Sequence, residues 1–589
     1  MARSSPSSPQ DNLATLAVFF SCRYPTDLHV LQDGSRSMDT HDDVQTSRPL
    51  DLQRAESSQS KKDFDVEAKI LSVSSHDSHD IYDGDDSTVD PVYRAKIMLI
   101  NDAFQEIGMG KYQWYLFVVA GFGWFSDNLW PIVTGLILTP TVNEFGYQGP
   151  FIKLGQAIGM LIGCVVFGVG SDIWGRRWSF NLTLFITALF AIAGGASSNA
   201  VALCAFVTVW SIGVGGNLPV DSAVFLEFVP ASHQYLLTTL SVFWSIGQLV
   251  GSLIAWPLIS NFSCASAASC PRASNQGWRY FTYTVGGLVM LLFVLRFFVF
   301  HLYESPRYLV GRGRDAEAVD VLHRVAAYNG KGCRLTVGML AAAGEAARRK
   351  MGESADVDEV RDEKGKEKEV GAVRAGLAVS RQVFSGKHVK ALFATRKLAL
   401  STTLLILMWA LIGLAYALYN SYIPYFLQTR GADFGDGSVY ITYRNQVILS
   451  VVGIPGAFLA GWMVELPYLG RNGTLAISTI LTGAFLLAST TARTSDALLG
   501  WNCGYSLTNN VMWGVLFAVT PELFPAKDRG TGNSVVELGD RIFNLFAPVI
   551  ALYADLTTAV PIWLSGALFI VAGFMAFLLP FEPRGKASI

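Results

Sequence analysis

One apolar stretch near the C-terminus, residues 531–554, carries an unusual set of polar side chains. Their spacing places them on one face of a helix; they are Asn533, Glu537, Asp540, Arg541 and Asn544. Glu537 and Arg541 are four residues apart and can form an ion pair. Two acids against one base leave one carboxylate without a counter-ion, and burial of such a group favours its protonated form. This face is therefore typical of a proton carrier, although a structural network between helices is the alternative.

Two further acids, Asp127 and Asp221, lie in earlier apolar stretches and have no cation within reach in their own helices. A carboxylate held by an arginine stays ionised, whereas a lone buried one can bind a proton and release it when water arrives. We therefore expect Asp127 to carry the proton, with Asp540 and then Asp221 as alternatives. Glu537 belongs to the same group of candidates. Arg541 is expected to bind an anionic group or to balance the neighbouring acids.

Amide and aromatic side chains in other apolar stretches suggest a binding site for a ligand. Amides suit the polar groups of a small organic molecule, and aromatic rings suit its ring faces. A single Tyr or Trp in such a stretch can instead anchor a helix at the membrane surface. The candidate substrate-binding residues, besides Arg541, are Asn128, Asn217, Gln248, Tyr416, Tyr419, Asn420, Asn509, Asn510 and Trp513.

These residues lie within or beside twelve apolar runs, most of them near the length of about 20 residues that a helix needs to cross a membrane. The sequence is 51% hydrophobic and 16% charged, with a mean hydropathy of +0.35, which indicates a membrane protein. The runs are Tyr112–Thr139, Phe151–Val169, Trp178–Ala196, Val201–Phe228, Leu236–Ile259, Gly277–Phe300, Leu398–Leu427, Ile441–Val464, Leu475–Thr490, Leu498–Thr520, Thr531–Ala554 and Val560–Pro580.

The chain divides by composition into four parts. Residues 1–91 are rich in Ser, Asp and His and poor in aromatics, which predicts a disordered cytoplasmic tail. Residues 92–301 hold six runs, preceded by an amphipathic helix over 92–107 that we expect to lie along the membrane surface. Residues 302–397 form a polar linker dense in Lys and Arg, and 398–589 hold the other six runs and a short tail.

The two sets of six runs share motifs at a constant offset of 295 positions. Gly175-Arg176 falls on Gly470-Arg471, and residues 227–231 (Glu-Phe-Val-Pro-Ala) fall on 522–526 (Glu-Leu-Phe-Pro-Ala). Internal repeats of this kind are a signature of secondary transporter folds. The sequence predicts an all-α membrane protein with twelve transmembrane helices in two pseudo-symmetric bundles of six.

Basic residues are concentrated on one side of the predicted membrane. The linker and the hairpins between runs on that side carry most of them, including Arg176, Arg177, Arg471, Lys527 and Arg529. The positive-inside rule then puts both termini and the linker in the cytoplasm. The other side carries few, namely Arg272, Arg430, Arg444 and Arg493. We expect a multi-pass protein of the plasma membrane.

The predicted exterior connection between the fifth and sixth runs carries modification signals. Asn261-Phe262-Ser263 is a glycosylation sequon, and Cys264 with Cys270 is a plausible disulfide in an exterior loop. A chance sequon and two free thiols are the alternatives.

Acids at predicted cytoplasmic helix ends face arginines on neighbouring loops. Such pairs form charge-assisted clamps near helix termini, and the alternative is a set of charges that only determines topology. The candidates for a cytoplasmic gate are Asp172, Arg176, Arg177, Glu227, Glu522 and Arg529. Because Gln234 stands where the second half has Arg529, we expect the clamp to be asymmetric.

Several of these motifs resemble the major facilitator superfamily. The G-x-x-x-D-x-x-G-R-R box at 168–177 is typical of it, and Tyr-Glu-Ser-Pro-Arg at 303–307 resembles a box of its sugar-porter branch. Residues 110–114 and 213–217 are similar to synaptic-vesicle-protein-like transporters and their fungal relatives. The resemblance covers residues 92–585. It implies that the first, fourth, seventh and tenth helices line a central cavity and that clamps close it on the cytoplasmic side.

Departures from the family pattern narrow the expected function. The seventh run lacks the Gln-Gln pair of hexose porters, and Asn217 stands where phosphate porters carry an acid. The Gly-Pro-rich box of drug antiporters is missing from the fifth run, which favours proton symport and import. We expect a proton-coupled transporter of a small polar organic solute, such as a sugar-like compound, an organic or aromatic acid, or a secondary metabolite.

Two other functions stay open, an efflux antiporter and a transceptor that binds solute without moving it. An enzyme has little support because no metal-ligand or triad spacing occurs, and Gly213-Val-Gly-Gly216 lies inside a run rather than after a strand. The expected partners are a small solute, protons and the lipid bilayer. We expect no cofactor, metal or nucleic acid, and a monomer.

Overall fold

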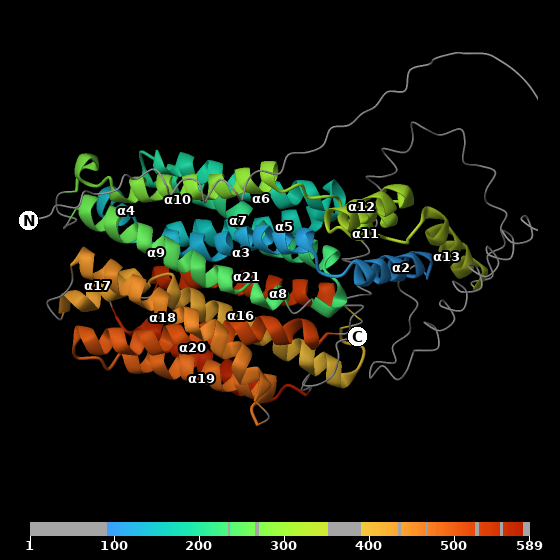
Figure 1. Ribbon diagram of the computed structural model, residues 1–589. Helices are drawn as coiled ribbons and strands as arrows, with labels where there is room; N and C mark the ends of the chain where they lie inside the picture. The colour runs from blue at the N-terminus through green and yellow to red at the C-terminus, as the bar shows by residue number, and fades with distance from the viewer. Residues whose placement is uncertain are drawn as a thin grey trace, which may run out of the picture. The chain divides into compact units, whose positions relative to one another are not determined.

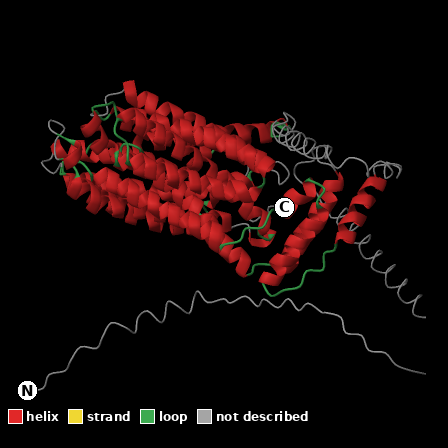
Figure 2. Ribbon diagram, turned by 90° about the horizontal axis from the view of Figure 1, so that it is seen from above, coloured by secondary structure: helices red, strands yellow, loops and turns green. Residues whose placement is uncertain are grey.

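The computed structural model describes residues 91–233, 236–264, 270–350, 390, 392–433, 438–466, 468–524, 529–553 and 558–580. Figure 1 shows how they are arranged, and Figure 2 shows that they consist of helices joined by loops. The predicted N-terminal tail, apart from Pro91, lies outside the described residues, as does most of the linker from residue 351 onward.

Twelve helices of the described chain correspond one to one to the twelve predicted runs, so the predicted fold class is confirmed. In the first half they are α3 Lys111–Leu136, α5 Pro150–Trp174, α6 Arg176–Gly195, α7 Ala200–Phe228, α9 Val242–Phe262 and α10 Gly277–Val294. In the second half they are α16 Arg396–Asn420, α18 Val439–Glu465, α19 Gly470–Ser489, α20 Ser495–Glu522, α21 Arg529–Tyr553 and α22 Val560–Ala576.

Nine of these described helices are long and apolar enough to cross a membrane by length and composition alone. The other three are α20, α21 and α22. The charged face of α21 lowers its hydropathy, and α22 has only 17 residues. Each of these three helices has a counterpart in the first half. The repeat therefore identifies them as membrane helices, although their hydropathy or length does not.

The two halves pack by the same plan. In the first half α5 and α6 contact α7, α3 contacts α9, and α6 contacts α10. The second half repeats each contact: α18 and α19 with α20, α16 with α21, and α19 with α22. The halves meet through α5 with α21 and through α9 with α18. In the repeat α5 corresponds to α18 and α9 corresponds to α21, so the two contacts are equivalent. The pseudo-symmetry predicted from the sequence repeat is therefore present in the packing.

Glycines allow the close approach of α5 and α7. A Cβ on Gly159 would lie 2.2 Å from the carbonyl oxygen of Thr208, and one on Gly163 would lie 2.0 Å from that of Ile212. Small residues at four-residue spacing let membrane helices touch backbone to backbone. In the second half Gly456 has the same role, since its Cβ would lie 2.6 Å from the Leu507 carbonyl oxygen on α20.

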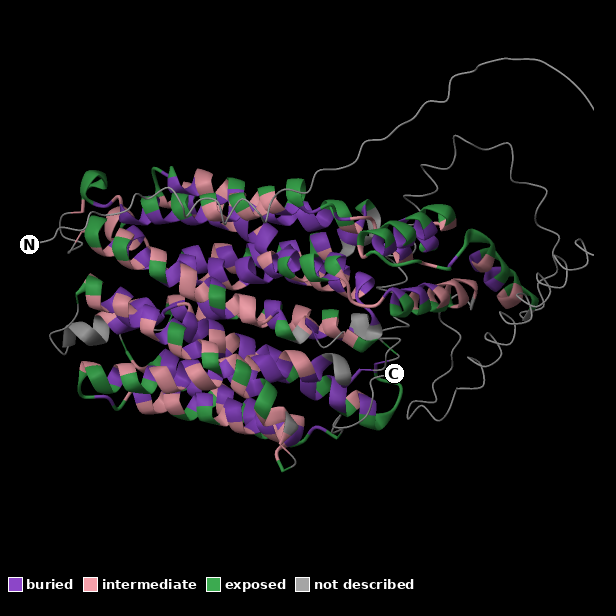
Figure 3. Ribbon diagram, in the orientation of Figure 1, coloured by how far each residue is buried: buried purple, intermediate pink, exposed green. Residues whose placement is uncertain are grey.

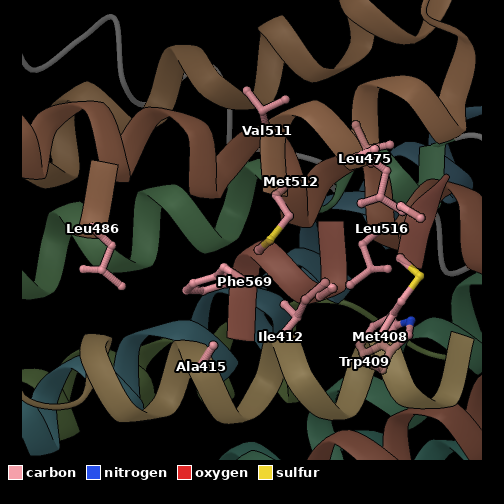
Figure 4. Packing of buried hydrophobic residues seen from close by; sticks show 14 of the residues in the cluster. Met408, Trp409, Ile412, Ala415, Leu475, Leu486, Val511, Met512, Leu516 and Phe569 are labelled. Atoms are coloured by element: carbon pink, nitrogen blue, oxygen red, sulfur yellow. The ribbon is translucent and has the colours of Figure 1, made fainter. Parts of the chain in front are cut away.

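The core of the second half is formed by apolar side chains of its long helices. Figure 4 shows Met408 and Ile412 of α16 with Leu516 of α20 and Phe569 of α22. All of them are almost fully buried. Figure 3 shows that buried residues follow the sides of the long helices that face one another. Lipid tails are as apolar as these side chains, so close van der Waals packing, rather than removal of apolar surface from water, stabilises each half.

Short helices extend both ends of the bundle. One end carries α4 Leu138–Phe145 and α17 Ile423–Asp433, and Asn261 of the sequon lies there too; we call it the sequon end. The opposite end carries α2 Pro91–Ile107 and the linker helices α11 Pro306–Gly311, α12 Asp315–Tyr328 and α13 Val337–Lys350; we call it the linker end. Between α7 and α9 lie the short η2 Ala231–His233 and α8 Leu236–Thr239.

The amphipathic pattern of α2 reflects packing on protein. Its apolar residues Ile100, Phe104 and Ile107 are buried in a cluster with side chains of the linker helices. Lys96 Nζ also donates to Asp315 at 2.5 Å. We expected this face to contact the membrane surface, and the linker helices cover it instead, because they supply an apolar surface that the sequence pattern of α2 alone does not reveal.

Candidate functional site

A cavity lies between the two halves, in the middle of the long helices. It measures about 140 Å³, well above the roughly 10–15 Å³ that one water molecule needs. Helices of both halves supply its wall. The residues that line it are Asp127, Asn128, Pro131, Lys153, Gln156, Ala157, Met160, Leu218, Trp244, Gln248, Trp409, Tyr416, Ala417, Ser421, Tyr422, Asn509, Asn510, Trp513, Phe517, Glu537, Asp540, Arg541, Asn544 and Pro548.

The charged residues of the cavity come from α3 and α21. Arg541 Nη2 on α21 donates to Asp127 Oδ1 on α3 at 3.4 Å, and both residues are buried. The expectation that Asp127 has no partner is therefore corrected. Same-helix spacing could not reveal this pair, because the arginine belongs to the other half of the chain. Glu537 and Asp540 also line the cavity, and Asp540 Oδ1 has no hydrogen-bond partner among the described residues.

Asp221 has a partner as well, and this corrects a second expectation. It forms an ion pair with Arg296, and both side chains are fully buried inside the first half. Arg296 lies in η5 Leu295–Val299, a π-helical turn that continues α10, and its guanidinium lies over the ring of Phe180. An arginine inside an apolar run needs an acidic partner, so Arg296 was the signal in the sequence that pointed to this pair.

A chain of hydrogen bonds links the halves beside the pair of Asp127 and Arg541. Asn420 Nδ2 donates to Tyr416 Oη at 2.6 Å, and Tyr416 Oη donates to Asn128 Oδ1 at 3.4 Å. Asn128 Nδ2 then donates to the carbonyl oxygen of Trp244 at 3.1 Å. Tyr416 and Asn128 line the cavity, whereas Asn420, also an expected binding residue, contacts Tyr416 but is not part of the lining.

The expected residues on α9 and α20 also lie in the cavity wall. They are Gln248, Asn509, Asn510 and Trp513. Ser245 Oγ donates to Asn510 Oδ1 at 3.1 Å, which adds another bond between the halves. The Oδ1 atom of Asn509 is buried and has no hydrogen-bond partner among the described residues. This acceptor is therefore unused in the present arrangement of the helices.

Two expected binding residues lie elsewhere. Asn217 is fully buried on α7 inside the first half. Tyr419 is packed in the core of the second half, where its hydroxyl donates to Asn502 and its ring contacts Tyr505. Both residues face helices of their own half, and only packing could distinguish these faces from the one that lines the cavity.

Aromatic rings line the cavity toward the linker end. Phe517 of α20 lies between Trp244 of α9, at 4.5 Å between ring centroids, and Trp409 of α16, at 4.7 Å. Trp513 contacts the same group, at 5.8 Å from Trp409. The sequence analysis named only Trp513, because single Trp and Phe residues in membrane helices do not indicate their direction. The rings of Trp244, Trp409 and Phe517 form one surface only because the two halves pack together.

Lys153 and Gln156 of α5 are cavity residues that the sequence analysis missed. Lys153 lies within an apolar run and is buried, with 3% of its surface exposed. Its Nζ donates to Thr134 Oγ1 at 2.7 Å, to the Pro131 carbonyl oxygen at 2.8 Å and to Gln156 Oε1 at 3.3 Å. A lysine inside a membrane run is a functional signal by itself, and this signal was present in the sequence.

At the linker end, Arg176 connects several elements of the first half. Its Nε donates to Glu227 Oε1 on α7 at 3.1 Å, and its Nη1 donates to Ser171 Oγ on α5 at 2.6 Å. Gly175, just before it, has a φ of 101°, a conformation that favours glycine. The neighbouring Arg177 is exposed.

Glu304, from the sugar-porter-like box, completes this cluster. Its Oε1 accepts from the backbone N–H of Arg176 at 2.9 Å, at the first residue of α6. A carboxylate at a helix N-terminus is stabilised by the helix dipole. Burial raises the pKa of Glu304, and the backbone N–H bonds from Ser305 and Arg176 oppose that change. Glu304 was not among the gate residues predicted from the sequence.

The other predicted gate side chains cannot be placed. Of Asp172, Glu522 and Arg529 the structure describes the backbone alone, so their side chains lie outside the described part of the chain. The asymmetry predicted for the clamp stays a prediction.

At the sequon end, Cys264 and Cys270 form a disulfide. Asn261 is exposed in the last turn of α9, where its Nδ2 donates to the Pro257 carbonyl oxygen at 2.8 Å. Nearby, Glu144 of α4 forms a buried ion pair with Arg279 of α10 at 2.6 Å. Burial alone would raise the pKa of Glu144, but hydrogen bonds from Arg279, Trp278 and Asn275 hold it below its ordinary value.

Known structures show the same fold. The xylose transporter XylE from E. coli, in a partially occluded inward-open conformation, matches with a TM-score of 0.57 at 15% identity, over 81% of this chain and 99% of XylE. XylE bound to 6-bromo-6-deoxy-D-glucose matches with a TM-score of 0.58 at 17% identity. At these identities the likeness concerns the fold.

Sequence comparison identifies relatives and a family. The "MFS siderochrome iron transporter 1" of Ceriporiopsis subvermispora is 60% identical over 85% of this chain and 93% of its own length. The "Niacin transporter NiaP" of Acinetobacter baylyi is 27% identical over 76% of this chain and 89% of its own. The family model described as "Sugar (and other) transporter" matches residues 155–583. The chain therefore belongs to the sugar (and other) transporter family of the major facilitator superfamily and is a multi-pass membrane transporter of the sugar-porter type.

Proposed function

We propose that the protein is a proton-coupled transporter that moves a small polar organic solute by alternating access. In this mechanism the solute binds in the cavity between the halves, which open alternately to the two sides of the membrane. Contacts between the halves at both ends of the cavity support the proposal. Trp244 packs on Phe517 toward the linker end, and the Tyr443 hydroxyl of α18 donates to the Leu136 carbonyl of α3 toward the sequon end.

The ion pair of Asp127 and Arg541 is the observation that carries the proposal. It joins α3 of the first half to α21 of the second at 3.4 Å, inside the cavity wall. A carboxylate held by an arginine stays ionised while the pair is closed, so Asp127 binds a proton only when the pair opens. The bound proton then removes the charge on which the charge-assisted bond to Arg541 depends. Protonation would then loosen one contact between the halves, which is the link that a proton-coupled cycle requires. Glu537 and Asp540 also lie beside Arg541. Either of them can take the place of Asp127 as the partner of Arg541.

Two prolines remove helical hydrogen-bond donors in this wall. Pro131 of α3 and Pro548 of α21 lie at the cavity, and each lacks the N–H that would bond to the residue four positions earlier. The carbonyl groups of Asp127 and Asn544 therefore lose their helical donors. Free carbonyl groups at membrane depth are tolerated where they face a cavity, and they offer further contacts to a hydrated or polar solute.

For the orientation, we propose that the linker end and both termini are cytoplasmic and that the protein acts as a monomer in the plasma membrane. The linker residues and Arg176 with Arg177 supply most of the basic charge at that end. The disulfide of Cys264 and Cys270 at the other end suits an oxidising exterior.

The test is a solute screen in proteoliposomes with an imposed pH gradient. The panel includes a sugar (xylose), an aromatic acid (niacin) and a siderochrome, following the names of similar proteins. Accumulation driven by inward protons supports the proposal. Expulsion of a preloaded solute by the same gradient would assign an efflux antiporter instead, and solute binding without flux would assign a transceptor.

Asp127→Asn tests the coupling step. We expect it to abolish accumulation against a gradient while exchange of labelled for unlabelled solute continues, because the cavity keeps its shape but loses the proton site. Arg541→Ala should instead weaken solute binding. Asp496→Asn is the control, since Asp496 is an exposed acid in the first turn of α20 and does not line the cavity. Gradient-driven accumulation by Asp127→Asn would place coupling elsewhere, with Asp540 the next candidate.

A further inference from the structure

Lys153 differs from the other buried cations of the helix bundle. Arg279 pairs with Glu144, Arg296 pairs with Asp221, and Arg541 pairs with Asp127. Lys153 is equally buried, yet its three hydrogen bonds go to a carbonyl, a hydroxyl and an amide. Among the described residues no carboxylate forms an ion pair with it. A buried ammonium group without a counter-ion costs free energy that the neutral acceptors only partly offset.

Helix stability does not explain this lysine. It lies in the first turn of α5, whose N-terminus begins at Pro150. The N-terminal end of a helix carries partial positive charge, so a cation there is unfavourable. Both the missing counter-ion and the position in the helix therefore argue that the positive charge serves something outside α5.

The cavity is the open space next to Lys153, and the second half of the chain lies close by. A Cβ on Gly135 would stand 3.6 Å from Lys153 Nζ and 3.1 Å from the Ser421 carbonyl oxygen. The next residue, Tyr422, lines the same cavity. Its side chain is buried, and its hydroxyl has no hydrogen-bond partner among the described residues. An ammonium group without a counter-ion and an unused hydroxyl donor thus lie in the wall of one cavity.

We propose that Lys153 and Tyr422 form a binding subsite for the carboxylate of the transported solute, which makes the substrate a singly charged organic acid. The inference rests on the proposed transport function and adds the substrate class. A carboxylate would accept from the Tyr422 hydroxyl, and it would accept from Lys153 Nζ in place of Gln156 Oε1, the longest of the three bonds at 3.3 Å. It would also supply the missing negative charge. A doubly charged anion is disfavoured, because Glu537 and Asp540 line the same cavity. The aromatic rings toward the linker end suit the apolar body of the acid.

The subsite also connects the two halves. Lys153 belongs to α5 in the first half, and Tyr422 follows α16 in the second. A carboxylate held by both would draw the halves together at the sequon end of the cavity. Solute binding would then favour closure of that end, which is the direction of change that import from the sequon side requires.

The test is solute binding to the full-length protein in detergent, measured by calorimetry with matched acid and amide pairs. The pairs are benzoate with benzamide, 3-phenylpropanoate with 3-phenylpropanamide, and hexanoate with hexanamide; phenyl phosphate is the doubly charged probe. The wild type should bind at least one carboxylate about tenfold or more tightly than its amide. Lys153→Met should remove this preference, and Lys153→Arg should retain part of it.

Tyr422→Phe should weaken carboxylate binding several-fold. Its matched control is Tyr505→Phe, because the Tyr505 hydroxyl is also buried without a hydrogen-bond partner among the described residues, but Tyr505 lies in the core of the second half and does not line the cavity. Ligand-free Lys153→Met should melt no lower than the wild type, since the change removes a buried charge. A lower melting temperature with an unchanged acid preference would assign Lys153 a structural role and overturn the inference.

Other outcomes also overturn it: equal binding of acids and amides, tighter binding of phenyl phosphate, or no binding of any carboxylate in the panel. These results are independent of the transport proposal. Gradient-driven uptake of a neutral solute would keep proton coupling and reject the subsite. Carboxylate binding that depends on Lys153, without gradient-driven uptake, would keep the subsite and reject proton coupling.

Discussion

Asp540 Oδ1 lies only 1.8 Å from the position that a Cβ atom on Gly413 would occupy. Gly413 therefore provides the space on α16 into which the carboxyl group of α21 fits. The first half repeats this arrangement with other helices, since a Cβ on Gly123 of α3 would lie 1.6 Å from Asp221 Oδ2 on α7. In each half a glycine makes room for a buried acid, but only Asp540 reaches the cavity.

Gly413→Ala should displace Asp540 from its place in the cavity wall. The added methyl group meets the carboxyl group below contact distance, and such overpacking costs about 1–3 kcal/mol. We expect lower thermal stability in detergent and a loss of gradient-driven uptake in proteoliposomes. Gly500→Ala on α20 is the control, because nothing lies within 4 Å of its Cβ position. Uptake by Gly413→Ala at the wild-type rate would argue against a role for Asp540.

Arg176→Ala should slow transport while the protein still folds. Arg176 holds Glu227 of α7 and Ser171 of α5 together at the linker end, so its loss should change how that end opens and closes. Initial uptake rates, normalised to the amount of protein in the vesicles, measure the effect. Arg177→Ala is the matched control, since Arg177 is exposed. Equal rates for both variants would mean that the box at residues 168–177 only determines the topology of the chain.

Glu144→Gln should destabilise the first half in a pH-dependent way. It breaks a buried pair and leaves Arg279 without its acid, which costs about 3–5 kcal/mol at pH 7. The pKa of folded Glu144 lies below its ordinary value of 4.5, so the pair stabilises the protein above that value. This contribution is lost as the pH falls through the lower, folded pKa.

The measurement for Glu144 is thermal unfolding in detergent from pH 7 down to pH 3. The difference between wild type and Glu144→Gln should be largest at pH 7 and should shrink below pH 4.5. Glu317→Gln is the control, because its pair with Arg314 is more than half exposed and exposed pairs contribute little. A difference that grows at low pH would contradict the assignment.

Asn261 should carry a glycan if the sequon end faces the exterior. Wild type made in a host with N-glycosylation should shift on a gel after glycosidase treatment, and Asn261→Gln should abolish the shift. Ser263→Ala removes the sequon while it leaves the asparagine in place, so it should give the same result. Asn261 lies in the last turn of α9. The end of that helix must therefore unwind before the enzyme that attaches the glycan can reach the asparagine. No shift in the wild type would remove this support for the orientation.

The sequence by itself determined the fold class and the ends of most helices. The lengths and apolar content of the runs identify the membrane helices, and the repeat at 295 positions predicts two similar halves. Helix caps such as Asn199 and Thr494 agree with these boundaries. These features are local, or repeated at a constant distance, so one-dimensional patterns reveal them. The helical face with Glu537, Asp540 and Arg541 was predicted in the same way, because residues at helical spacing share a face.

The partners of the buried charges were decided by the tertiary structure alone. Asp127 is paired across the halves with Arg541, 414 positions away, and Asp221 with Arg296 on another helix. A sequence shows that a buried charge needs a partner, but the partner depends on which helix faces meet. Lys153 is the clearest case. Its type and position mark it in the sequence, while its lack of a counter-ion and its place beside the cavity follow only from the packing of α3, α5 and the second half.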